Sequence, residues 1–254
     1  GSCEDVENSF TVTINNTPLA DAPGDVESCD SYTLPALSNG TYYAQAGGVG
    51  PIEAGTAITE TQTIYVFTAG NGSCEDVENS FTVTINDTPL ADAPRNLEAC
   101  DSYSLPALEN GAYYATSGGL DPIPSGTVIT ETQTIYVFAA GNGSCENVEN
   151  SFTVTISDTP VADALEDVEA CDSYELPALS GGNQYFTNSG GTGTELFPGD
   201  EITESQEIFI YVAATGSCIS AENSFSVTIN TTPIADAPAD VEACDTYTLP
   251  SLEN

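Results

Sequence analysis

Eight cysteines and 39 acidic side chains are the residues of this 254-residue chain that could do chemistry. Cysteines form disulfides or bind metal ions, and carboxylates act as acid–base groups or as oxygen ligands for calcium. The chain has no His, and Arg95 is its only Lys or Arg. Because His usually supplies acid–base catalysis near neutral pH and cations stabilise developing anions, the composition argues against an enzyme.

The formal net charge of the chain is −38 at pH 7. Phosphate binding needs clustered cations, so this charge argues against nucleic acid and against an anionic membrane surface as partners. The sequence contains no run of about 18 apolar residues, which argues against membrane insertion by this segment. Since 40% of the residues are apolar, with 12 Tyr and 9 Phe, we expect folded cores rather than disorder.

The cysteine spacing predicts disulfides rather than zinc, because neither His nor a Cys-x-x-Cys motif is present. Two pairings respect the spacing. One joins Cys29–Cys74, Cys100–Cys145 and Cys171–Cys218, and the other joins Cys3–Cys29, Cys74–Cys100, Cys145–Cys171 and Cys218–Cys244. Geometry favours the first pairing, which leaves Cys3 and Cys244 to other partners. In the second pairing the bonded cysteines flank an extended strand whose ends lie about 20 Å apart, so the chain would have to fold back across a domain boundary. Either pairing indicates an oxidising compartment and export.

Internal repetition organises the chain. The motif Glu-Asn-Ser-Phe begins at Glu7, Glu78, Glu149 and Glu222, and Cys-Asp-(Ser/Thr)-Tyr begins at Cys29, Cys100, Cys171 and Cys244. Each copy reads as short strands separated by turns. Phe81 and Val83 alternate with threonines, which predicts a half-buried strand, and residues 135–138 are apolar on both faces, which predicts a central strand. We expect an all-β fold.

The joints between repeats are predicted at Pro18, Pro89, Pro160 and Pro233, each of which follows the end of a predicted strand. This gives three whole domains at residues 18–88, 89–159 and 160–232. Residues 1–17 are then the final strand of a preceding repeat, and residues 233–254 are the opening strands of a following one. On this interpretation the chain is a window cut from a longer array.

Several motifs recur with substitutions along the chain, and in the first copy they read Thr-Pro-Leu-Ala-Asp-Ala-Pro (17–23), Cys-Asp-Ser-Tyr-Thr-Leu-Pro (29–35), Ile-Thr-Glu-Thr-Gln-Thr-Ile-Tyr-Val-Phe (58–67) and Glu-Asn-Ser-Phe-Thr-Val-Thr-Ile (78–85). Across the whole chain they resemble the tandem repeats of giant cell-surface adhesins of Bacteroidetes, including flavobacterial gliding-motility adhesins. The resemblance implies immunoglobulin-like β-sandwich domains in an extended rod, on a filament exported by type IX secretion. It also implies one disulfide per domain, at Cys29–Cys74, Cys100–Cys145 and Cys171–Cys218.

Acidic residues recur at fixed places in the repeats. Asp21, Asp92 and Asp163 lie at the joints, and Asp30, Asp101 and Asp172 each follow a cysteine. Calcium takes six to eight oxygen ligands, so the first three are candidates for a cation site that stiffens each joint. The alternative is that these carboxylates keep the surface solvated and stop like repeats from pairing. No other cofactor is expected.

The sequence therefore predicts a stalk or filament segment of a large exported surface adhesin, located outside the cell at the cell surface. Its expected partners are neighbouring repeats of the same filament, and possible further partners are surface polysaccharide or a substratum. Two functional classes stay open. Either the repeats are spacers that project and load a distal adhesive region, or the repeats themselves bind surface glycans.

Overall fold

A computed structural model describes residues 1–237 and 239–251 of the chain. Across these residues the secondary structure consists of 21 β-strands without a helix, which confirms the all-β prediction. The described part of the chain accordingly contains no helix long and apolar enough to cross a membrane.

Internal contacts divide the chain into two compact units. Unit 1 comprises Gly1–Arg95, Pro106–Thr127 and Thr134–Phe152, and unit 2 comprises Asn96–Leu105, Val128–Gln133 and Thr153–Asn254. Unit 1 therefore contains all of the predicted repeat 18–88, unit 2 contains all of the predicted repeat 160–232, and the predicted repeat 89–159 contributes to both. We call residues 18–88 the first repeat, residues 89–159 the second repeat and residues 160–232 the third repeat.

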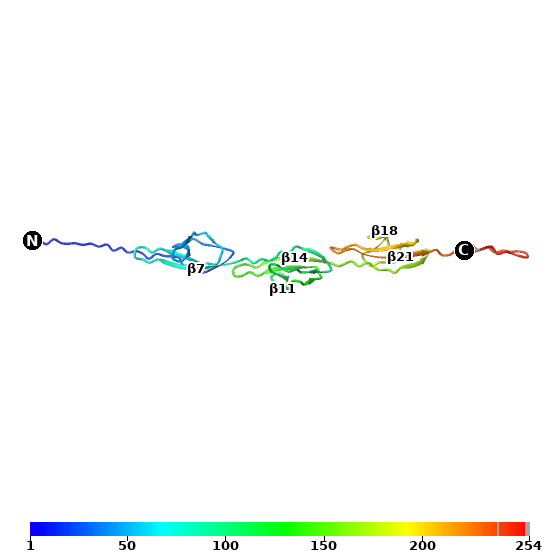
Figure 1. The fold of residues 1–254 in the computed structure, drawn as a ribbon, viewed down its shortest axis with the longest axis horizontal. Helices are drawn as coiled ribbons and strands as arrows, with labels where there is room; N and C mark the ends of the chain where they lie inside the picture. Colours follow the sequence, from blue (N-terminus) through cyan, green and yellow to red (C-terminus); the bar gives the residue numbers. More distant parts are fainter. Residues whose placement is uncertain (238, 252–254) are drawn as a thin grey trace. The chain divides into compact units, whose positions relative to one another are not determined.

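The first repeat contains seven strands, β1 (Val26–Cys29), β2 (Tyr32–Thr33), β3 (Thr41–Gln45), β4 (Val49–Ile52), β5 (Ala57–Ile58), β6 (Gln62–Thr68) and β7 (Val77–Asn86), with the long β7 labelled in Figure 1. Five of them form a sheet in the order β1-β7-β6-β3-β4, and β2 pairs with β5. Strand β1 runs parallel to β7, whereas the other pairs are antiparallel.

The core of the first repeat forms where these strands bury alternate side chains. Phe81 and Val83 of β7 are buried, whereas Thr82 and Thr84 are only partly buried, as the alternation predicts. The core consists of seven buried residues, Leu34, Tyr42, Ile58, Ile64, Val66, Phe81 and Val83. Strand β6, which corresponds to residues 135–138 of the second repeat, lies between β7 and β3 and is central as predicted.

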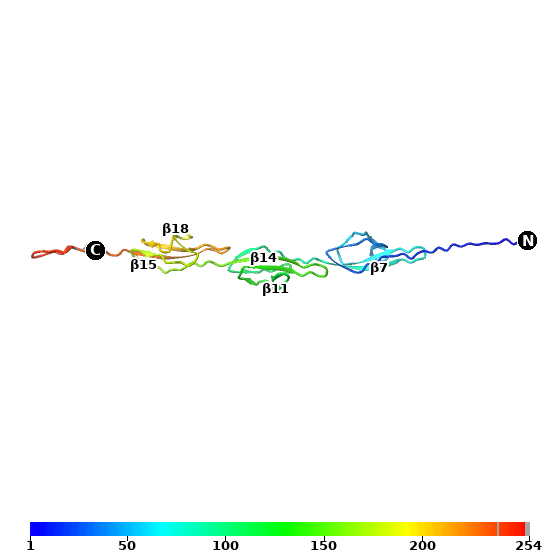
Figure 2. The ribbon, with the colours of Figure 1, turned by 180° about the vertical axis from the view of Figure 1, so that it is seen from behind.

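The third repeat follows the same plan, with strands β15 (Val168–Cys171), β16 (Tyr174–Glu175), β17 (Asn183–Asn188), β18 (Thr192–Leu196), β19 (Glu201–Ile202), β20 (Gln206–Val212) and β21 (Ala221–Asn230). Its five-stranded sheet has the order β15-β21-β20-β17-β18, so that β15 and β18 are its two edges (Figure 2). Strand β15 is again parallel to the last strand, β21.

The second repeat contains β8 (Leu97–Cys100), β9 (Tyr103–Ser104), β10 (Ala112–Thr116), β11 (Leu120–Ile123), β12 (Val128–Ile129), β13 (Gln133–Ala139) and β14 (Val148–Ser157). Within unit 1, β10 pairs with β11 and with β13. Within unit 2, β14 pairs with β8 in parallel and β12 pairs with β9. These pairings match those of the first and third repeats.

The strand order assigns the fold. In the main sheet the last strand lies between the first and the sixth, and the third and fourth strands follow beyond the sixth. Strands two and five form a second layer. This arrangement is an immunoglobulin-like β-sandwich. The predicted fold class is therefore confirmed. No strand is assigned to residues 1–17 or to the described residues after Asn230, so the two partial repeats expected there stay predictions.

The Glu-Asn-Ser-Phe motif has a structural explanation in the first repeat. The Glu78 carboxylate accepts a hydrogen bond of 2.6 Å from the backbone N–H of Gly47 in the β3–β4 turn. The Asn79 side chain donates 3.0 Å to the carbonyl of Ala20, in the segment that enters the repeat. Phe81 packs in the core against Tyr42, with ring centroids 6.2 Å apart. The motif thus ties one strand to a turn, to the entering segment and to the core.

Candidate functional site

The disulfides join consecutive repeats, and this corrects the predicted pairing. Cys29 bonds Cys145, with an S–S distance of 2.04 Å and a Cα–Cα distance of 4.9 Å, and Cys100 bonds Cys218, at 2.02 Å and 4.9 Å. Cys3, Cys74, Cys171 and Cys244 are free. The predicted bonds Cys29–Cys74, Cys100–Cys145 and Cys171–Cys218 are therefore wrong, and in the described structure no disulfide closes a single repeat.

The parallel pairing of the first and last strands explains the error. It places Cys29, at the end of β1, beside Asn86, at the end of β7. Cys74 lies just before β7 begins, at the opposite end of a strand of 10 residues. Such a strand is about 30 Å long, whereas disulfide-bonded residues need Cα atoms within about 7 Å. Cys29 and Cys74 therefore lie at opposite ends of one sandwich and cannot bond.

Two kinds of cysteine follow from this geometry. The strand cysteines, Cys29, Cys100 and Cys171, end β1, β8 and β15. The loop cysteines, Cys74, Cys145 and Cys218, lie in the segments that precede β7, β14 and β21. Each bond connects the strand cysteine of one repeat to the loop cysteine of the next, so the joint is crossed both by the backbone and by a disulfide.

In unit 1, the loop that carries Cys145 packs closely on the end of the first repeat. The Cys145 sulfur lies 3.3 Å from the carbonyl oxygen of Asn86. Gly143 has a φ of +53°, and a Cβ at this position would collide with the side chains of Asn86 and Glu27. These two side chains hydrogen-bond to each other at 2.8 Å. Glycine is required here both by the backbone conformation and by the absence of space.

In unit 2, the loop that carries Cys218 is built in the same way. The Cys218 sulfur lies 3.1 Å from the carbonyl oxygen of Ser157. Gly216 also has a φ of +53°, and a Cβ there would collide with the Ser157 hydroxyl. The Thr215 hydroxyl donates 3.0 Å to the carbonyl of Asp158, at the start of the joint. The loop therefore contacts the end of the last strand of the preceding repeat, and the residue after it, at several points besides the disulfide.

An aspartate beside each strand cysteine fixes the exit of the chain from the repeat. Asp30 has a φ of +59°, and its carboxylate accepts 2.8 Å from the backbone N–H of Thr88 and 2.6 Å from the Thr88 hydroxyl. Asp101 makes the same two bonds to Thr159, at 2.8 and 2.6 Å. These bonds hold the pKa of both carboxyls below the ordinary 3.8. The bond from the threonine hydroxyl contributes most, and the bond from the backbone N–H contributes next.

The candidate calcium residues make hydrogen bonds within their own repeats. Asp21 accepts 2.6 Å from the Ser38 backbone N–H and 3.1 Å from the Asn39 side chain, which lowers its pKa, the Asn39 bond contributing most. Asp92 makes the equivalent bonds and also has a lowered pKa. Asp163 accepts 2.6 Å from the Ser180 N–H. These bonds give the carboxylates a structural role, and calcium binding at them stays a prediction.

One other group of potential metal ligands is present among the described residues. Sulfur and oxygen atoms of Cys100, Asp101 and Cys218 lie within 4.8 Å of one another. Both sulfurs are in a disulfide, and a disulfide sulfur lacks the charge of the thiolate that binds metals. The group is therefore part of the disulfide site.

Small hollows lie beside Tyr42 and Tyr113 in unit 1. Their volumes are about 240 and 270 Å³, below the usual size of a small-molecule site. Tyr42 is buried, and its neighbour Tyr43 packs edge-on against Phe67 with centroids 5.8 Å apart. Tyrosines 42 and 43 therefore serve mainly in packing.

The sequence contains one further signal for the disulfide site. Gly-Ser-Cys precedes each final strand, at residues 72–74, 143–145 and 216–218. A glycine kept two positions before a cysteine indicates a close backbone approach, which a disulfide inside one small domain does not require. The aspartates after the strand cysteines recur visibly in the sequence, but their threonine partners lie about 58 residues away and show no local pattern.

Comparison with known proteins shows loose structural similarity. No family model matches the chain, and no curated protein matches it. Among solved structures, a three-domain fragment of titin, I67–I69, is 11% identical, with 84% of this chain and 98% of that chain covered and a TM-score of 0.47. Immunoglobulin domains 1–5 of Sidekick-1 are 12% identical, with 85% and 60% covered and a TM-score of 0.33. Extracellular domains 3–5 of Drosophila OTK are 8% identical, with 85% and 96% covered and a TM-score of 0.35.

Strand order and register, rather than these similarities, define the fold. The disulfides fit an oxidising environment. The chain is an all-β protein of tandem immunoglobulin-like sandwiches in which each disulfide joins one repeat to the next.

Proposed function

We propose that this chain is a load-bearing segment of an extracellular stalk or filament, which projects an adhesive region and transmits force to it. The observation that carries the proposal is the placement of both disulfides across joints between repeats. A disulfide that only stabilises a small domain closes a loop inside that domain. A disulfide across a joint instead resists separation and bending of the two domains that it connects.

The surface chemistry supports a role without catalysis. The chain has 39 carboxylate side chains and a single basic side chain, that of Arg95. Among the described residues no charged residue is buried. Exposed like charges repel over about 8 Å at physiological salt, so they act between close neighbouring filaments and on solubility. A filament surface needs this property where many copies lie side by side.

The finer assignment rests on the repeat motifs. They support a giant surface adhesin of a Bacteroidetes bacterium, exported by type IX secretion, with the gliding-motility adhesin SprB as the nearest likeness. We place the joints at Pro18, Pro89, Pro160 and Pro233, with repeats at 18–88, 89–159 and 160–232, and we retain calcium at Asp21, Asp92 and Asp163 as a second means of stiffening. The partners are neighbouring repeats and, at the adhesive region, surface polysaccharide or a substratum.

Single-molecule stretching of the chain from its two ends tests the mechanical role. With both disulfides closed, the shortest covalent path between the ends runs through about 110 of the residues. The remaining residues, about 145, then add no length after unfolding, so reductant should lengthen the unfolded chain by about 500 Å. Equal extension with and without reductant would overturn the proposal.

A glycan array probed with the same chain separates the two functional classes. The stalk proposal expects no binding to any glycan by this chain, because the adhesive region lies elsewhere. Saturable binding to one class of surface polysaccharide would instead support repeats that adhere directly.

A further inference from the structure

The free Cys74 has the same surroundings as the two bonded loop cysteines, Cys145 and Cys218. Its thiol donates to the carbonyl oxygen of Asn15 at 3.5 Å, and the corresponding distances from Cys145 to Asn86 and from Cys218 to Ser157 are 3.3 and 3.1 Å. A Cβ on Gly72, whose φ is +58°, would collide with the Asn15 side chain, as one on Gly143 would with Asn86. The loop of the first repeat therefore has the bonded conformation, although Cys74 is free.

The free Cys171 has the same surroundings as the two bonded strand cysteines, Cys29 and Cys100. It stands opposite Asn230 in the β15–β21 pair, just as Cys29 stands opposite Asn86 and Cys100 opposite Ser157. The next residue, Asp172, has a φ of +63° and accepts 2.9 Å from the N–H of Thr232 and a second bond from its hydroxyl. This is the same arrangement that surrounds the two bonded strand cysteines. The Cys171 thiol is exposed and free.

We propose that Cys74 and Cys171 are two open halves of the same inter-repeat disulfide. Cys171 takes the loop cysteine of a repeat that follows it, and Cys74 takes the strand cysteine of a repeat that precedes it. The partner in each case is an immunoglobulin-like repeat of this chain's own type, with Gly-Ser-Cys before its last strand and Cys-Asp at the end of its first. The pairing then follows one rule throughout an array of such repeats.

The bond forms by thiol–disulfide exchange with an oxidised disulfide donor, such as oxidised glutathione or a disulfide oxidoreductase. Two thiols lose two electrons and two protons and become one disulfide, and the donor disulfide is reduced to two thiols. Because the surroundings of the free Cys74 and Cys171 match those of the bonded cysteines, the partner repeat needs only to dock for the sulfurs to meet.

An extended chain tests the proposal directly. We would duplicate residues 160–232 immediately after residue 232, oxidise the full chain in a glutathione buffer, and count free thiols by alkylation and intact mass under denaturing conditions. The original chain has four free cysteines, and the duplication adds two. The proposal expects four free thiols and three disulfides in the extended chain. Six free thiols, with the added repeat shown to be folded by its hydrogen-exchange protection, would overturn it.

Two variants of the extended chain identify the residue that bonds. Cys171→Ser leaves the added loop cysteine without its partner, so the count of disulfides should fall from three to two. Cys244→Ser is the matched control, because it also removes one exposed cysteine but should leave three disulfides. If Cys244→Ser rather than Cys171→Ser removes the third bond, the pairing rule is wrong. A chain in which residues 18–88 are duplicated before residue 18 tests Cys74 in the same way.

Discussion

Gly143 of the second repeat approaches the Asn86 side chain of the first repeat so closely that a single added methyl group would overlap it. The contact lies two residues from Cys145, whose sulfur is bonded to Cys29. Asn86 is also opposite Cys29 in the β1–β7 register, so one residue contacts both sides of the bond. The disulfide therefore depends on a backbone approach that only glycine allows.

Replacement of Gly143 by Ala should weaken this joint. The methyl group must displace Asn86 or Glu27, and we expect slower oxidation of the Cys29–Cys145 pair and a loss of stability of about 1–3 kcal/mol. The measurement is the rate at which the Cys29–Cys145 bond forms in a glutathione buffer, followed by alkylation and mass. Gly118→Ala is the matched control, because Gly118 also has a positive φ, +82°, but a Cβ there meets nothing within 4 Å. Equal effects of the two variants would show that backbone strain, and not the contact, is responsible.

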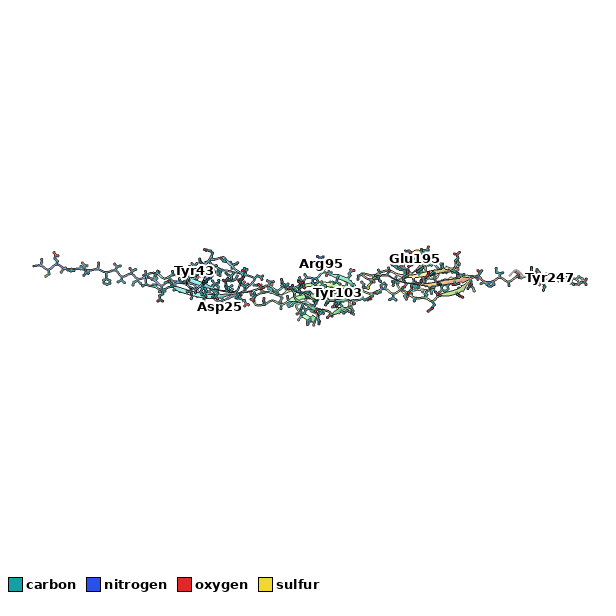
Figure 3. The ribbon with its side chains drawn as sticks, in the orientation of Figure 1. Asp25, Tyr43, Arg95, Tyr103, Glu195 and Tyr247 are labelled. Atoms are coloured by element: carbon teal, nitrogen blue, oxygen red, sulfur yellow. A yellow bond between two sulfur atoms is a disulfide. The ribbon has the colours of Figure 1, made fainter. Side chains whose placement is uncertain are left out.

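Trypsin should report the pairing of the cysteines in one step. Arg95 is the only Lys or Arg, and it is exposed in the segment of the second repeat that precedes β8 (Figure 3). Cleavage after Arg95 should leave a single species on a denaturing gel without reductant, because Cys29 and Cys145 lie on opposite sides of the cut. With reductant, the chain should separate into pieces of 95 and 159 residues.

Two variants decide which bond holds the cut chain together. Cys29→Ser should release the two pieces without reductant, whereas Cys74→Ser should not, because Cys74 is free. Release in Cys74→Ser would mean that a Cys74–Cys100 bond crosses the cut. Separation of the unmutated chain without reductant would mean that each disulfide closes its own repeat.

Acid should remove the contribution of the aspartates that follow the strand cysteines. The pKa of Asp30, Asp101 and Asp172 is lowered in the folded chain, mainly by the hydroxyl bonds from Thr88, Thr159 and Thr232. A lowered folded pKa gives stability that is present above the unfolded value of 3.8 and is lost as the pH falls through the folded pKa. The triple variant with Asn at these positions keeps a residue that tolerates positive φ but lacks the charge. The difference in Tm between the original chain and this variant should be present at pH 6 and should shrink as the pH falls below 3.8. A difference independent of pH would contradict the assignment.

Two buried tyrosines at matching positions should respond differently to loss of their hydroxyl groups. The Tyr185 hydroxyl donates 3.1 Å to the carbonyl of Pro177, and burial, followed by Tyr174 and Asp163, raises its pKa to about 12. The Tyr42 hydroxyl is buried without a hydrogen-bond partner in the described structure. Tyr185→Phe should cost about 1 kcal/mol, while Tyr42→Phe should be neutral or stabilising. Hydrogen exchange of β17 and β3 measures the two effects, and equal losses would contradict this interpretation.

The sequence predicted those features that local patterns encode. Alternation of apolar and threonine residues in β7 follows from which face of a strand is buried, and the run of apolar residues in β6 follows from its central position. The cysteine pairing could not be read in this way. It depends on β1 running parallel to a strand that begins about 50 residues later, which places Cys29 at the end of the sandwich far from Cys74.

The candidate aspartates show the same limit. Asp21 and Asp92 were identified as candidate ligands from their recurrence, and the structure gives each of them hydrogen-bond donors 17 residues away. Recurrence indicates that a residue is used in every repeat, but it does not distinguish an ion from an N–H group. Only the fold brings the donors of the next loop into position.

The two disulfides interlace along the chain, because Cys100 lies between Cys29 and Cys145, and Cys145 lies between Cys100 and Cys218. A single break of the backbone anywhere from residue 29 to residue 218 consequently leaves every atom joined to both ends. Proteases and chemical damage act on exposed proteins one bond at a time, and a chain connected in this way survives a first cut anywhere within that span. Two breaks within residues 29–218 are needed before this part of the molecule separates.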